Sequence, residues 1–265
     1  MSLVYVINAD FANPNGTVYV IDNKTNNIIA NIQMIGNPLF IAMAPQCQYA
    51  YVVNQIPTAN GNIAVIDTKT HAIISTIQVG LVDDTGITSA TNIIVSNDGQ
   101  FVYVLNLDNN DMSVIDTKTN AIIATVQVGM GPSNLAFSSY GQYVYVSNTI
   151  ESTITVIDTK MHRAVSTVQV GDFPFSFVIT PDGQSIYIAN VNGNSVSTID
   201  TRRNQLIATI PVGTAPAAVS VTANGRYVYV ANANSDTVSV IDTMKNQVVS
   251  TIETGTFPFG LAILP

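Results

Sequence analysis

Hydrophobic and polar residues alternate along this chain in short runs that are rich in β-branched and aromatic side chains. The stretch 175–212 holds four such runs, at 175–180, 185–190, 195–200 and 205–212. Turn-forming residues separate them, for example Pro181-Asp182-Gly183 after the first run. A period of two residues is typical of β-strands. No segment shows a helical period, so the pattern predicts an all-β protein.

The four-strand unit recurs six times. Each copy carries a Tyr-X-X-Asn element in its second strand, beginning at Tyr5, Tyr51, Tyr103, Tyr145, Tyr187 and Tyr229, and the last four tyrosines are 42 residues apart. Four antiparallel strands in about 42 residues are typical of a β-propeller blade, which buries its two faces against neighbouring blades. We therefore predict one domain over residues 1–265, a single six-bladed β-propeller.

The two ends of the chain predict how the ring closes. The chain begins with a second strand, at 4–8, and ends with a first strand, at 259–264. We expect this C-terminal first strand to pair with the N-terminal second, third and fourth strands in one shared blade. Proline placement agrees, because Pro cannot donate to a central strand ladder. Five prolines stand at the starts of first strands: Pro38, Pro132, Pro174, Pro216 and Pro258.

The Tyr-Val-X-Asn element resembles the repeat of the YVTN β-propeller family. The segments Val114-Ile115-Asp116-Thr117-Lys118-Thr119-Asn120 and Pro181-Asp182-Gly183 are equally typical of it, and the resemblance extends over essentially the whole chain. It implies the propeller fold. It implies no single function, because such propellers occur in surface-layer, binding and enzymatic proteins.

Most repeated residues have structural interpretations. The Asp of each Ile-Asp pair precedes a tight turn, where a carboxylate accepts nearby backbone N–H groups. We expect the Asn after each second strand to fix the following loop in the same way, and the tyrosines to pack between blades with their hydroxyls at the surface. Gly99 and its equivalents supply positive φ in a turn, a slot that Cys47 takes in one copy. His71 and His162 occupy turn positions as well and form no metal pair.

Composition and charge exclude several classes of protein. The chain is 47% hydrophobic and 10% charged, which is not typical of disorder. Nine basic against 17 acidic residues give a net charge of −8, which disfavours nucleic acid as a partner. One Cys excludes an internal disulfide and a multi-Cys zinc site. No apolar run is long enough for membrane insertion, and no signal peptide precedes the first strand. We expect a cytoplasmic protein, or a secreted or cell-surface one if a signal peptide is removed.

The charges separate by the side of the propeller on which they lie. We call "upper" the side that carries the second-to-third-strand loops and the connections between successive units; the other two turns of each unit lie on the lower side. All basic residues fall on the lower side: Lys24, Lys69, Lys118, Lys160, Arg163, Arg202, Arg203, Arg226 and Lys245. The upper side carries acids alone: Asp10, Asp83, Asp84, Asp108, Asp111, Glu151, Asp172, Asp236 and Glu253. Such a surface attracts cations, although acidic loops also serve solubility.

The repeat is least regular on the upper side. The second-to-third-strand loops of the first two units are longer by four and three residues, and the connection after Asp67 by seven. Loops that depart from a repeat are where function tends to lie. We predict a rigid binding scaffold that engages a cationic small molecule, a peptide or a protein partner. The aromatic candidates equally fit a plug of the channel mouth. The candidate ligand-binding residues are Asp10, Phe11, Gln55, Asp83, Asp84, Thr85, Asn92, Asn134, Asp172, Phe173, Phe175, Phe257 and Phe259.

The alternative is a metal-assisted hydrolase, lyase or isomerase, lactonase-like, with its site in the upper funnel. No His or Cys falls on the upper side, so a Ser-His-Asp or Cys-His arrangement cannot form there. Catalysis would depend on carboxylates around Ca²⁺ or another hard divalent cation. Asp83 and Asp84 are the metal-ligand candidates. We expect no cofactor and a non-enzymatic protein, with this enzyme as the second hypothesis.

Overall fold

The computed structural model describes residues 3–10, 15–55, 61–79 and 90–264. The chain divides into two compact units, Met1–Gln127 and Val128–Pro265, which we describe in turn. Among the described residues every element is a β-strand. None of these residues forms a helix that is long and apolar enough to cross a membrane.

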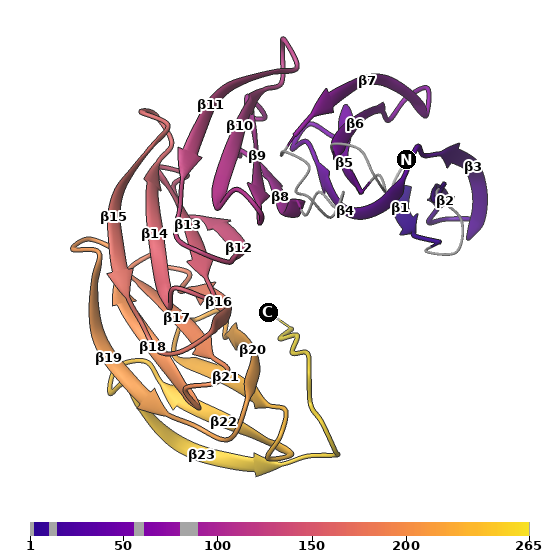
Figure 1. Ribbon diagram of the computed structural model, residues 1–265. Helices are drawn as coiled ribbons and strands as arrows, with labels where there is room; N and C mark the ends of the chain where they lie inside the picture. Colours follow the sequence, from indigo (N-terminus) through magenta and orange to yellow (C-terminus); the bar gives the residue numbers. More distant parts are fainter. Residues whose placement is uncertain (1–2, 11–14, 56–60, 80–89, 265) are drawn as a thin grey trace. The chain divides into compact units, whose positions relative to one another are not determined.

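The first unit contains three antiparallel sheets whose strands follow one another in chain order (Figure 1). The first sheet has three strands: β1 (Leu3–Asn8), β2 (Thr17–Asp22) and β3 (Asn27–Gln33). The second sheet comprises β4 (Asn37–Met43), β5 (Tyr49–Gln55), β6 (Asn62–Asp67) and β7 (Ala72–Gln78). The third sheet comprises β8 (Ala90–Val95), β9 (Phe101–Asn106), β10 (Asp111–Asp116) and β11 (Ala121–Gln127).

The second unit contains three four-stranded sheets of the same order. The first comprises β12 (Pro132–Phe137), β13 (Tyr143–Asn148), β14 (Thr153–Asp158) and β15 (Arg163–Gln169). The next comprises β16 (Pro174–Ile179), β17 (Ser185–Asn190), β18 (Ser195–Asp200) and β19 (Gln205–Pro211). The last comprises β20 (Pro216–Val221), β21 (Tyr227–Asn232), β22 (Thr237–Asp242) and β23 (Gln247–Glu253).

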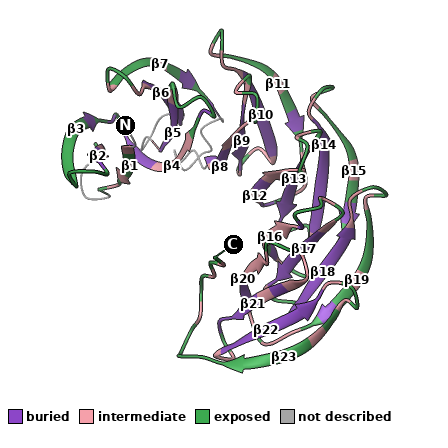
Figure 2. Ribbon diagram, turned by 180° about the vertical axis from the view of Figure 1, so that it is seen from behind, coloured by how far each residue is buried: buried purple, intermediate pink, exposed green. Residues whose placement is uncertain are grey.

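The core of each unit lies between neighbouring sheets. Tyr145 of β13 packs with Ile188 and Ile199 of the next sheet, and Tyr187 packs in the same way with Val228 and Ile241. In the second unit the second and third strands are therefore mostly buried, whereas the fourth strands are mostly exposed (Figure 2). The packing role expected for the tyrosine stripe is confirmed at these positions.

The turn chemistry expected from the repeat is present. Asp116 Oδ1 accepts the N–H groups of Lys118 at 3.0 Å and Thr119 at 2.8 Å, and the equivalent Asp200 does the same for its own turn. Left-handed backbone occurs at Gly183 and, without glycine, at Cys47, His71 and His162. These residues therefore have structural roles in the turns.

Two expectations about polar groups were wrong in detail. The Asn at the ends of β5, β9, β13, β17 and β21 donates to side chains of the third strand and does not accept loop N–H groups: Asn190 Nδ2 lies 3.0 Å from Ser195 Oγ and 2.9 Å from Ser197 Oγ. The Tyr187 hydroxyl also does not reach the surface. It donates to Asn246 Oδ1, at 2.7 Å, in the turn between β22 and β23.

An all-β protein with six antiparallel blades is thus confirmed, with one qualification at the chain ends. The first sheet has three strands, and residues 254–264 form no strand. The expected pairing of 259–264 with β1 is not among the strand pairs of the described residues. Closure of the ring therefore stays a prediction, as does the single domain.

Candidate functional site

In the second unit, the loops and turns lie on the two sides of the sheets as the sequence predicted. On the upper side of the second unit, Met130 N–H donates to Glu151 Oε2 at 3.0 Å, and Gly193 N–H donates to the carbonyl of Asp172 at 3.2 Å. Second-to-third-strand loops therefore contact the connections between sheets. On the lower side the Thr243 hydroxyl donates to the carbonyl of Gly225 at 2.8 Å, which joins the other two turns.

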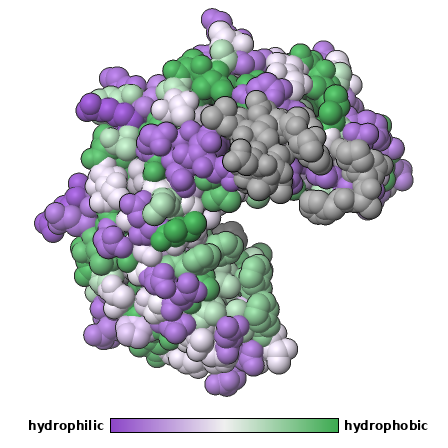
Figure 3. Space-filling model, in the orientation of Figure 1, coloured by the Kyte–Doolittle hydropathy of each residue, from purple (hydrophilic) through white to green (hydrophobic). Residues whose placement is uncertain are grey.

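An aromatic cleft lies on the upper side of the second unit. It is a cavity of about 300 Å³ lined by Phe173 and Phe175 from one connection and by Phe257 and Phe259 from another. In Figure 3 hydrophobic surface covers the place where β20 and the C-terminal segment lie in Figure 1. The other lining residues are Val191, Ala215, Ala217, Ala233 and Asn234.

The repeat itself builds this cleft. Three successive connections read Phe173-Pro174-Phe175, Ala215-Pro216-Ala217 and Phe257-Pro258-Phe259. The outer two supply aromatic walls, and the middle one supplies small side chains at the same two repeat positions. The cleft is therefore the space that two phenylalanines would fill if the middle connection matched its neighbours.

The cleft is held in place by backbone hydrogen bonds. Val191 N–H donates to the carbonyl of Phe173 at 3.0 Å, and Ala215 N–H donates to Asn194 Oδ1 at 2.9 Å. Phe257 N–H donates to Asp236 Oδ1, also at 2.9 Å. The rings of Phe257 and Phe259 stack, with centroids 6.1 Å apart and planes 5° from parallel.

Two aromatic residues of the cleft have left-handed backbone. Phe173 has φ 58° and Phe257 has φ 56°, and Ala215 between them has φ 51°. The equivalent residue one sheet earlier is Gly131, with φ 73°. For a residue with a Cβ this conformation costs about 1–2 kcal/mol, and a bulky residue there is an outlier. Strain of this kind tends to gather at functional sites.

Carboxylates border the cleft. Asp172 precedes Phe173 directly and is exposed, and its Oδ1 accepts from Ser152 Oγ at 3.4 Å. Asp236 binds the Phe257 backbone as described above. In the described upper connections of the second unit there is no Lys or Arg to neutralise them. The arrangement combines aromatic faces with negative charge and offers no positive charge.

Asn134, a predicted residue of the second unit, does not line this cleft. Asn134 binds the N–H of Leu135, at 2.9 Å, through its Oδ1. In the first unit, Asp10 N–H donates to Asn37 Oδ1 at 3.0 Å, Gln55 ends β5, and Asn92 accepts from Ile93 N–H at 2.8 Å. Phe11, Asp83, Asp84 and Thr85 lie outside the described residues. Among those that are described, no three His, Cys, Asp or Glu side chains gather as metal ligands.

Sequence reasoning missed the small residues of the cleft. Ala215 and Ala217 are informative only when the repeats are aligned, because each stands where its neighbours on both sides have Phe. Asn234 and Val191 carried no signal of their own, since loops of every copy contain such residues. The alignment of three connections would have located the cleft.

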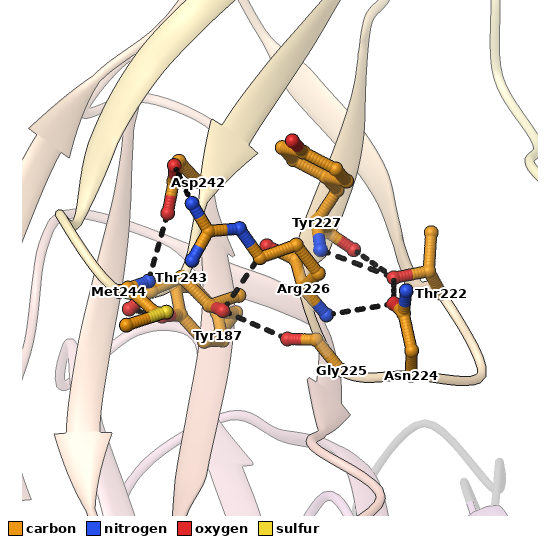
Figure 4. A network of polar contacts seen from close by, with 9 residues as sticks. All are labelled: Tyr187, Thr222, Asn224, Gly225, Arg226, Tyr227, Asp242, Thr243 and Met244. Atoms are coloured by element: carbon orange, nitrogen blue, oxygen red, sulfur yellow. Dashed lines mark hydrogen bonds and ion pairs between the residues drawn. The ribbon is translucent and has the colours of Figure 1, made fainter.

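The lower side has two larger hollows that repeat from sheet to sheet. One, of about 560 Å³, lies beside Tyr187 and Arg226, and its equivalent, of about 660 Å³, lies beside Tyr145 and Arg202. Arg226 pairs with Asp242 at 2.7 Å, and the turn around it is fixed by Asn224 and Thr222 (Figure 4). Hollows that recur with the repeat are a consequence of blade packing, so we regard these as structural.

A fold of six repeated antiparallel sheets defines a protein of the β-propeller class. The sequence model of the YNCE-like β-propeller family matches residues 4–265, and the chain belongs to that family. The YVTN resemblance is thereby supported as far as the β-propeller fold. None of the curated proteins matches the chain.

Several solved structures are similar to it. Pseudomonas aeruginosa periplasmic gluconolactonase PpgL has 20% identity and a TM-score of 0.71, over 96% of this chain and 83% of that one. A Bacteroides uniformis protein, named as a candidate 6-phosphogluconolactonase, has 15% identity and a TM-score of 0.71 over the same shares. Kuenenia stuttgartiensis hydrazine synthase has 18% identity and a TM-score of 0.55, over 83% and 88%. At such identities the likeness concerns the fold.

Proposed function

We propose that this protein is a binding scaffold whose aromatic cleft takes a small organic cation, either free or as a cationic side chain of a peptide or protein. The observation that carries the proposal is the pair of strained phenylalanines, Phe173 and Phe257, that line the cleft from two different connections. Gly131 shows that a residue without a Cβ serves this backbone position elsewhere in the repeat. Keeping Phe173 and Phe257 there costs stability, so their rings are retained for what they contact.

The chemistry of the cleft selects a cation. Aromatic faces attract ammonium and guanidinium groups, by about 0.5–1 kcal/mol when exposed and about 2 kcal/mol when desolvated. Asp172 and Asp236 add negative charge at the border, and Asn234 offers one polar side chain within it. A volume of about 300 Å³ suits a small ligand or one side chain.

Binding of choline, compared with its neutral carbon isostere 3,3-dimethylbutan-1-ol, tests this proposal by calorimetry. The two molecules have the same shape and differ in charge, so we expect choline to bind more tightly and the difference to shrink with added salt. Phe175→Ala and Phe259→Ala should each weaken choline binding by roughly 3- to 30-fold. Tyr140→Ala, at an exposed position on the lower side, is the matched control and should change nothing. Equal affinities for the two molecules would refute the cation proposal.

The second candidate is a metal-assisted, lactonase-like hydrolase. Its support is the fold likeness to a protein named as a gluconolactonase. Asp83 and Asp84 remain its proposed metal ligands. The choline titration says nothing of this candidate, which is tested by thermal unfolding with Ca²⁺ against EDTA and by hydrolysis of gluconolactone. A Ca²⁺-dependent shift that Asp83→Asn/Asp84→Asn abolishes, together with turnover, would favour the enzyme over the scaffold.

A further inference from the structure

The fourth strand of every sheet has an unpaired edge. In β3, β7, β11, β15, β19 and β23, one edge pairs with the third strand, and the other pairs with no strand among the described residues. The outward N–H and C=O groups of such an edge are a template for another strand. The chain therefore presents six equivalent edges.

Of the devices that protect natural edge strands, only a β-bulge is common to all six of these strands. Natural edge strands are short, carry Lys, Pro or inward charges, or have a bulge that twists the edge away. Here each strand is seven residues long, and the six contain two charged residues, Arg163 and Glu253, and one proline, Pro211. Each has a bulge in its first half, such as the extra residue Ile123 in β11, which is 48% exposed. The four residues after the bulge continue in regular register.

Charge near the two ends of β15 and β23 favours one orientation of a partner strand. Lys160 and Arg163 lie at the start of β15, whereas Asp172 follows its end. Lys245 precedes β23, and Glu253 ends it. If two such strands pair antiparallel, the basic start of one lies beside the acidic end of the other. A parallel pair would place like charges together.

We propose that copies of this chain associate edge to edge, with a fourth strand of one copy pairing antiparallel with a fourth strand of another. A second copy fits such an edge, because it supplies a strand rich in β-branched residues with at most one charged side chain, and β15 and β23 have opposite charges near their two ends. Antiparallel pairing of equivalent strands is a two-fold, self-complementary contact. The proposal does not depend on what the aromatic cleft binds.

Sedimentation velocity over a range of protein concentrations tests the proposal. We expect concentration-dependent dimers and larger species at low salt, and fewer at high salt because the end-to-end charge pairs are screened. Lysines in the regular part of each edge should raise the dissociation constant by roughly tenfold or more, because like charges then face each other across the strand pair. The exposed positions for these lysines are Asn31, Thr76, Thr125, Thr167, Thr209 and Thr251.

A control with six lysines on lower-side turns carries the same added charge away from the edges. Its exposed positions are Asn23, Asn97, Ser139, Tyr140, Ala223 and Met244, and it should associate like the parent. Hydrogen exchange of the parent protein gives a second measurement that needs no variant. Outward amides of the fourth strands should become protected as concentration rises. A protein that stays monomeric, equal loss of association in both variants, or unchanged exchange at these amides would overturn the proposal.

Discussion

The glycines that follow β11, β15 and β19 each lie against an asparagine of the next sheet. A methyl group added at Gly171 would lie 2.5 Å from Nδ2 of Asn190, and one at Gly129 would lie 2.7 Å from Nδ2 of Asn148. The asparagines cannot withdraw freely, because their amides donate to hydroxyls of the third strand. Glycine is therefore required here by close approach, and positive φ is not the reason.

Gly171→Ala should consequently destabilise the protein by about 1–3 kcal/mol, the usual cost of overpacking a filled site. Asn190→Ala costs hydrogen bonds by itself, but it also removes the group that the new methyl meets. In a double-mutant cycle followed by urea unfolding, the combined loss should be smaller than the sum of the single losses. Strictly additive losses of unfolding free energy, or a Gly171→Ala variant as stable as the parent, would contradict the contact between Gly171 and Asn190.

The buried tyrosines form a matched pair for a second prediction. Tyr187 donates its hydroxyl to Asn246, whereas the equivalent Tyr145 hydroxyl has no hydrogen-bond partner among the described residues. Tyr187→Phe should therefore cost about 0.5–1.5 kcal/mol of unfolding free energy. Tyr145→Phe should cost less or stabilise, since it removes a buried polar group without breaking a bond. Equal losses of unfolding free energy at pH 7 would contradict this prediction, because the two hydroxyls would then have equivalent hydrogen bonds.

The same tyrosines predict how stability depends on pH. Burial raises the pKa of Tyr51, Tyr145 and Tyr187 to about 12, above the usual value of 10.0. The folded protein therefore keeps phenol protons that the unfolded chain releases, so the contribution of these tyrosines to stability is constant below pH 10 and is lost between pH 10 and 12. Urea unfolding across this range should show the fall, and Tyr145→Phe should make it shallower. Absorbance at 295 nm should show these phenols ionising last.

At the scale of elements, the repeat in the sequence predicted almost all of the strands. The boundaries of β16 to β18 fall within a residue or two of the alternating runs, because every blade repeats the same turn chemistry at Gly183 and Asp200. Two features were not predicted from the sequence. The donor role of Asn190 depends on hydroxyls five and seven residues away. The aromatic cleft forms where a connection with small residues follows one connection with phenylalanines and precedes another. Only a comparison of the three copies reveals this difference.

The candidate site was therefore predicted in part. Phe173, Phe175, Phe257 and Phe259 were identified as aromatic residues of the upper side, and the structure brings them to one cavity. Asp10 and Gln55 were chosen because the loops near them are long, and loop length does not specify which side chains meet. Asp83 and Asp84 lie outside the described residues, so the proposed metal site remains a prediction.

At the scale of the whole molecule, the first sheet shows what an absent strand does. Val4 and Val6 of β1 are 46% and 41% exposed, whereas the equivalent Val144 and Val146 of β13 are fully buried. The repeat places Asn8 at the end of β1 and Gly255 after β23, in the relation that Asn190 has to Gly171. Closure of the ring by residues 259–264 would bring this last pair together as well.

Gly255→Ala distinguishes a closed ring from open ends. A Cβ built at Gly255 meets nothing within 4 Å, so without closure the substitution should be neutral, or stabilise by about 0.4–1 kcal/mol through the unfolded chain. In a closed ring the methyl group would meet Asn8, and the loss should approach that of Gly171→Ala. If Asn8→Ala then restored the unfolding free energy, the loss would be assigned to the contact with Asn8. The sign of the change in unfolding free energy therefore reports whether the last blade is shared between the two ends of the chain.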